Sequence, residues 1–155
     1  MVLAAVCLIY AGLQNLYYKI ISQETLIGTI KCAKSTDNDY DLYLLYLPGI
    51  NQPKYNSKLI ELKGNEWGFE GEIIKWDRPL NLIGLKTIHR PISIFDSTGN
   101  RFSLESEFEK FLFKIYKSAP GVDTSFISIV KQTFTPKIKF GVFLTNSGYL
   151  VRKIR

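Results

Sequence analysis

The sequence holds few of the residues from which metal sites and catalytic centres are built. One histidine, His89, and two cysteines, Cys7 and Cys32, occur among its 155 residues. A structural zinc site takes four such ligands and a disulfide framework takes several cysteine pairs, so neither is expected. Phosphate-binding loops and dinucleotide fingerprints are absent from the sequence as well. We therefore expect no metal, no cofactor and no enzyme activity.

The remaining candidates for chemistry have plainer interpretations. His89 lies in a strand-like segment beside Arg90, and no nucleophile motif accompanies it. Cys32 is interpreted as a buried thiol that behaves as a small apolar side chain. Glu70 and Glu72 fall on one face of a predicted strand, where we expect ordinary solvated carboxylates rather than a catalytic pair.

Acidic residues are missing from the C-terminal segment 124–155, which contains six lysines and arginines. The rest of the chain balances 14 basic with 14 acidic residues, so the whole net charge of +6 lies in this segment. Such a patch attracts anionic headgroups, nucleic acid or an acidic protein face. We expect no nucleic acid, because the aromatic residues that would stack on bases fall mainly on faces predicted to be buried.

Charge is also missing before Lys19. As a helix, the first 18 residues would cover about 27 Å, close to the thickness of a bilayer's hydrocarbon core. Tyr17 and Tyr18 next to Lys19 suit a membrane–water boundary. We predict a membrane anchor helix over 1–20, which makes the lipid bilayer a partner, and a soluble, mainly β domain over 21–155.

Two other interpretations of the N-terminal segment stay open. A cleavable signal peptide has an apolar region of similar length, but this sequence lacks a basic n-region and an A-x-A-like site. A buried core helix is the other alternative. The lysines after the span favour a cytoplasmic domain only weakly, because long domains translocate largely regardless of such charges.

From residue 24 onward the chain alternates β-rich runs with turn formers. We predict an α+β domain in which a bent antiparallel sheet or small barrel of about eight strands packs against one helix. The helix is predicted near 104–118, capped by Ser103 or Ser106, with an apolar stripe assigned to the core. The strand-like runs are 25–34, 39–48, 58–76 with a break inside it, 85–100, 125–136 and 137–155.

Two hairpins are predicted from turn residues. Gly64-Asn65 stands between two strand-like runs. At the C-terminus, a three-residue loop with left-handed Gly148 would place Thr145 opposite Tyr149. That pairing predicts one apolar face and an opposite face that carries a basic patch. The apolar face would hold Phe140, Val142, Leu144, Leu150 and Ile154, and the patch would hold Lys139, Lys153 and Arg155.

The segment 79–84 is unusual because a connection between two strands carries aliphatic residues. Either these side chains fold back and close one end of the sheet, or they contact a membrane or partner, with basic residues as neighbours. We predict a docking surface made of the loop 79–86 and the basic C-terminal sheet. Its candidate residues are Arg78, Leu80, Leu82, Ile83, Lys86, Lys139, Lys153 and Arg155.

Three stretches carry a family resemblance: WDRPLNLIGLK at 76–86, APGVD at 119–123 and LTNSGYLVR at 144–152. With them, the chain resembles a family of small bacterial proteins with one N-terminal membrane segment, often labelled multidrug transporter or cation/multidrug efflux pump. The resemblance implies a single-pass protein of the bacterial inner membrane, and it favours a periplasmic domain. One span cannot enclose a translocation path, so transport by this chain alone is not expected.

The expected function is therefore a non-catalytic accessory or interaction domain of a bacterial envelope complex, with other membrane or envelope subunits as partners. The alternative is a small β-barrel that binds a lipid or another apolar ligand. A barrel of that kind needs a central apolar cavity, whereas a docking domain needs a filled core and an exposed apolar patch.

Overall fold

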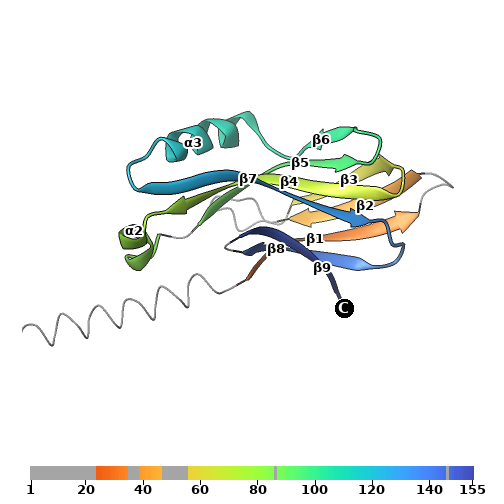
Figure 1. Cartoon of the computed structure of the whole chain (residues 1–155). Helices are drawn as coiled ribbons and strands as arrows, with labels where there is room; N and C mark the ends of the chain where they lie inside the picture. The colour runs from red at the N-terminus through yellow and green to blue at the C-terminus, as the bar shows by residue number, and fades with distance from the viewer. Residues whose placement is uncertain (1–23, 35–38, 47–55, 86, 146) are drawn as a thin grey trace, which may run out of the picture.

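The computed structural model describes residues 24–34, 39–46, 56–85, 87–145 and 147–155, with the side chains of 39–46 and 56 left aside. Within these ranges the chain forms nine strands and two helices (Figure 1). The elements are β1 (Thr25–Lys34), β2 (Asp39–Tyr46), β3 (Asn56–Lys63), β4 (Glu66–Trp76), α2 (Arg78–Leu82), β5 (Ile88–Asp96), β6 (Arg101–Ser103), α3 (Glu107–Lys117), β7 (Val122–Thr133), β8 (Lys139–Thr145) and β9 (Gly148–Ile154).

The strands form two antiparallel sheets. One has five strands in the order β3-β2-β1-β8-β9, and the other has four in the order β6-β5-β4-β7. The sheets lie face to face, and α3 covers the outer side of the four-stranded sheet (Figure 1). The expected β-rich domain with few helices is confirmed. Its strands are divided between two packed layers rather than joined in one bent sheet or barrel.

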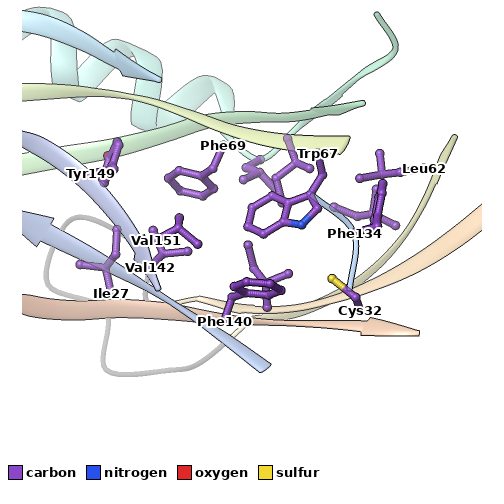
Figure 2. Close-up of a cluster of buried hydrophobic side chains, with 14 of the residues drawn as sticks. Ile27, Cys32, Leu62, Trp67, Phe69, Phe134, Phe140, Val142, Tyr149 and Val151 are labelled. Carbon is purple, nitrogen blue, oxygen red and sulfur yellow. The ribbon is translucent and has the colours of Figure 1, made fainter. Parts of the chain in front are cut away.

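The hydrophobic core lies between the two sheets (Figure 2). Trp67 and Phe69 of β4 point into it from one layer, and Phe140 of β8 points into it from the other. The rings of Trp67 and Phe140 meet edge to face, with their centroids 5.7 Å apart. Cys32 lies in the same core and is completely buried, as predicted, and its burial raises the pKa of the thiol.

Gly64-Asn65 is not a hairpin turn, contrary to the prediction. β3 pairs with β2 in the five-stranded sheet, and β4 pairs with β5 and β7 in the other sheet, so this dipeptide carries the chain between layers. Gly64 has a φ of +88°, and a Cβ at this position would lie 2.0 Å from the Ser97 hydroxyl. Gly64-Asn65 therefore forms a connection between the two sheets. A Gly-Asn pair predicts a tight turn, but it does not specify which strands pair with each other.

The C-terminal hairpin forms, but its predicted register is wrong by one residue. Thr145 pairs with Gly148 instead of Tyr149, so the loop has two residues rather than three. A one-residue shift reverses the face of every side chain on a strand. Tyr149 and Val151 are consequently the apolar side chains of β9 that are buried, whereas Leu150 is exposed.

Helix α3 begins at a capping box, in which Ser106 Oγ accepts from the Glu109 amide while Glu109 Oε2 accepts from the Ser106 amide. Its predicted apolar stripe is core only in part: Leu104, just before the helix, is buried, and Leu112 and Tyr116 are half-buried. Phe113 is the buried residue of the helix, and Phe108, Phe111 and Ile115 are exposed.

The predicted anchor, residues 1–20, lies outside the described residues. In the part of the chain that the structure covers, neither helix has the length and apolar character required to cross a membrane.

Candidate functional site

The aliphatic segment between β4 and β5 forms the short helix α2. Backbone and side-chain hydrogen bonds hold both ends of it in place. Asn81 Nδ2 donates to the Trp76 carbonyl at 2.6 Å, and the Leu85 amide donates to the Leu80 carbonyl at 3.1 Å. The Asp77 amide donates to the Gly121 carbonyl at 2.8 Å, which joins the start of α2 to the start of β7.

The side chains of this segment divide between the two expected roles. Leu80 and Leu82 are half-buried, and a Cβ added to Gly121 would come within 2.1 Å of the Leu80 side chain. Leu80 thus fills space at the end of the sheet. Ile83 is 76% exposed, and Leu85 is also exposed. The segment is both a structural corner and an apolar projection, and Gly84 with a φ of +97° follows the projecting Ile83.

α2 lies at the end of the sandwich where β1 begins (Figure 1). Thr25, the first residue of β1, pairs with Leu144, next to the turn between β8 and β9. That turn contacts β7, since a Cβ on Gly148 would lie 3.9 Å from the Phe126 ring. The Lys75 amine in turn lies 5.0 Å from the centroid of the same ring, one residue before the end of β4.

A row of apolar side chains crosses the five-stranded sheet at this same end. Leu26 of β1 pairs with Phe143 of β8, which pairs with Leu150 of β9. Leu26 and Leu150 are exposed, and the Arg152 guanidinium lies 4.2 Å from the centroid of the Phe143 ring. Arg152 also forms an ion pair with Glu24, the first described residue.

The predicted docking residues are not all brought together. Lys139 pairs with Ile154 and with Lys31, which places it toward the end of the sandwich opposite α2. Because of the corrected register, Lys153 pairs with Phe140, whereas Lys139 belongs to the other face of the hairpin. Arg155 is exposed beyond the end of β9, and Lys86 lies outside the described residues. The aliphatic segment and the C-terminal bases are therefore separate surfaces.

His89 is buried between the sheets. Its Nδ1 lies 3.4 Å from the Tyr149 hydroxyl, and the ring of Tyr149 also packs edge to face on Phe69. Burial lowers the pKa of His89 from 6.5 to about 4 and raises the pKa of Tyr149 above its ordinary value. His89 is thus a buried imidazole packed against the Tyr149 ring and hydroxyl.

Glu70 and Glu72 are buried, contrary to the expectation of solvated carboxylates. Glu72 accepts from Lys117 at 2.7 Å, Arg90 at 2.9 Å and Ser125 at 3.0 Å. Although burial acts to raise the pKa of Glu72, these partners hold it below its ordinary value. Sequence reasoning missed this site because the second layer that covers the outer face comes from α3, far along the chain.

The ion pairs continue across the outer face and fasten α3 to the sheet. Arg90 contacts Glu105 at 2.8 Å, and its guanidinium lies 4.9 Å from the centroid of the Phe113 ring. Glu70 accepts from Ser93 at 3.0 Å and pairs with Arg101. The carboxylates of Glu70 and Glu72 are thus occupied by partners from four elements, β5, β6, α3 and β7.

Within the described ranges, no group of three or more potential ligands is arranged to hold a metal ion. Comparisons with protein-family models, curated proteins and solved structures gave no match to this chain.

Proposed function

We propose that this protein is a non-catalytic accessory domain of a bacterial envelope complex, anchored by its N-terminal segment, and that the α2 end of its sandwich rests on the bilayer. The observation that carries the proposal is Ile83, which directly follows the short helix α2 and is 76% exposed. With the neighbouring exposed Leu85 it forms an apolar projection beside basic residues, and this combination supports a contact surface.

The position of β1 supports a contact with the membrane. The predicted anchor ends at residue 20 and β1 begins at Thr25. An extended chain covers at most about 3.5 Å per residue, so this connection spans no more than roughly 18 Å. The end of the sandwich that contains the start of β1, α2 and the β8–β9 turn would therefore be held close to the bilayer surface.

The chemistry of α2 suits that location. Ile83 and Leu85 offer exposed aliphatic groups, and Arg78 and Lys75 supply positive charge close by. Apolar side chains flanked by basic ones are the composition that binds the interface of anionic membranes. The apolar row of Leu26 and Leu150 at the same end adds to this surface.

The alternative, a lipid-binding β-barrel, has less support. A ligand pocket for an apolar molecule usually encloses about 300 Å³ or more. Here the interior between the sheets is occupied by side chains, among them Trp67, Phe69 and Phe140, each of which is almost completely buried. A filled core together with exposed apolar residues favours docking.

Membrane contact can be measured with an environment-sensitive fluorophore at residue 83 of the full-length chain in vesicles. The label would be attached to Ile83→Cys in a Cys7→Ser background, since Cys32 is completely buried. Leu59→Cys is the matched control, because Leu59 is 57% exposed on the edge strand β3. We expect a blue-shifted emission at residue 83 alone, stronger in anionic than in zwitterionic vesicles. Equal, water-like emission from the labels at residues 83 and 59 would refute the proposed contact with the bilayer.

The role in a complex is tested by purification from detergent-solubilised native membranes. We expect partner proteins with the unaltered chain and with Leu59→Asp, and we expect the same partners with Ile83→Asp if that residue contacts lipid only. A chain that purifies alone in all three cases would refute the accessory function while leaving the fluorescence result unaffected.

A further inference from the structure

Helix α3 has two different apolar faces. Phe113 points to the sheet and is 1% exposed, whereas Phe108, Phe111 and Ile115 are 66%, 60% and 51% exposed. At about 100° per residue, these three side chains project within roughly 60° of one another and about 140–160° away from Phe113. The outer face of the helix is thus a compact apolar stripe turned away from its own domain.

The domain does not need this stripe to hold α3. The opposite side of the helix makes the attachments: Phe113 packs under Arg90, Tyr116 meets Trp76 at 6.5 Å between ring centroids, and Lys117 binds Glu72. Two exposed phenylalanines and an isoleucine on one well-anchored helix form a contiguous apolar patch, and the largest patch of this kind on a protein surface is often an interaction site.

We propose that a second copy of this chain covers the stripe, with the two α3 helices packed antiparallel about a two-fold axis near Phe111. The spacing of the stripe, i, i+3 and i+7, is that of a helix–helix seam. In this antiparallel pair, Phe108 of one copy lies beside Ile115 of the other copy. Phe111 of each copy lies next to the region around Phe111 of the other. The pattern therefore complements itself, as a two-fold interface requires.

The charges of the helix are self-complementary in the same orientation. Glu107 in the first turn is almost fully exposed, and Lys114 lies exposed on the same flank, one heptad later. An antiparallel arrangement brings Glu107 of each copy toward Lys114 of the other. It also sets the positive end of each helix dipole beside the negative end of the other. Lys110 pairs with Glu107 at 2.7 Å within one chain and remains beside this contact.

The available area suits a modest but specific interface. A large aromatic side chain buries about 150–250 Å², so the exposed parts of the stripe amount to roughly 300 Å² per copy. Ile127 and Ile129 are also exposed, on β7 of the same sheet that α3 covers. They lie on the sheet face beneath the helix and not on its outer side, so the stripe itself gives about 600 Å² for the two copies together, to which the flanking Glu107 and Lys114 side chains add; this is a small interface.

Disulfide cross-linking of the full-length chain in native membranes tests this arrangement. In a Cys7→Ser background, Phe111→Cys lies near the two-fold axis and should give a covalent dimer on mild oxidation. A mixture of Phe108→Cys with one tag and Ile115→Cys with another should give a dimer that carries both tags. Leu59→Cys, equally exposed on β3 of the other sheet, should stay monomeric.

The absence of a dimer at 111, or equal cross-linking at 59, would overturn the proposal. So would capture of a different protein by Phe111→Cys. Because these positions are exposed on the surface, the variants should fold, and retained circular dichroism would check this.

Charge reversal tests the orientation of the helices independently. Glu107→Lys and Lys114→Glu should each reduce the cross-linked fraction at 111 severalfold, because each sets like charges against each other. The double variant restores opposite charges across the two-fold axis and should recover most of the dimer. A double variant that cross-links no better than either single one would exclude the antiparallel arrangement.

Discussion

The stability of the domain should fall between pH 7 and pH 5 because of one residue, His89. The side chain is 8% exposed, and burial lowers its pKa from 6.5 to about 4. In the unfolded chain the imidazole takes up a proton below pH 6.5, whereas in the folded protein it stays neutral until about pH 4. The depressed pKa thus contributes stability that is fully present above pH 6.5 and is lost as the pH falls toward 4.

The size of the effect follows from the two pKa values. A difference of one unit corresponds to about 1.4 kcal/mol, so the complete loss amounts to about 3 kcal/mol, with about 2 kcal/mol of it between pH 7 and pH 5. Glu72 and Asp96 also have lowered pKa values, so their contributions are lost only below their ordinary values of 4.5 and 3.8. The interval from pH 7 to pH 5 therefore isolates the histidine.

The assay is denaturant unfolding of the full-length chain in detergent micelles, followed by the fluorescence of the buried Trp67. His89→Gln is the matched variant, because its amide can still reach the Tyr149 hydroxyl but does not titrate. We expect the unaltered chain to lose about 2 kcal/mol of unfolding free energy over this interval and the variant to lose little. An unaltered chain whose stability is flat from pH 7 to pH 5, or a variant with the same slope, would refute the reasoning.

Two further predictions concern single positions whose geometry is specific. Ser106→Ala removes the side-chain half of the capping box and should lower the free energy of unfolding by about 1 kcal/mol, measured by the same denaturation; no change would mean that the cap adds nothing. Gly71→Ala should cost about 2 kcal/mol, because its Cβ would lie 2.5 Å from the Tyr149 hydroxyl and 2.7 Å from the Arg90 carbonyl oxygen. An unchanged thermal midpoint for this variant would contradict the close packing of β4 against its neighbours.

The hydrophobic pattern was sufficient to locate most of the regular elements. The strand predicted at 25–34 coincides with β1, and the alternation of Trp67 and Phe69 with polar neighbours identified the buried face of β4. Helix α3 falls within the predicted range, with Ser106 as its cap. These features depend on contacts between residues that are close in sequence. Such contacts can be predicted from the apolar periodicity and from the turn-forming residues.

The candidate site was only partly readable from the sequence. The segment 79–84 stood out because aliphatic residues are unusual in a connection, and Ile83 is indeed exposed. Lys139 and Lys153 were predicted to form one docking surface with it, yet they lie toward the opposite end of the sandwich. The charge composition of a segment does not show where its side chains lie in the fold. The distance between two segments depends on the order of the strands in the sheets.

Taken alone, the sequence determined the β-rich character of the domain, the single amphipathic helix, and the scarcity of metal ligands. Only the tertiary structure decided that Gly64 turns between sheets, that β9 presents Tyr149 rather than Leu150 to the core, and that α3 buries Phe113 while exposing its stripe. The reason is that the apolar pattern of a sequence identifies only which side chains can be buried. Which surface covers each of them is set by contacts between segments far apart in the chain.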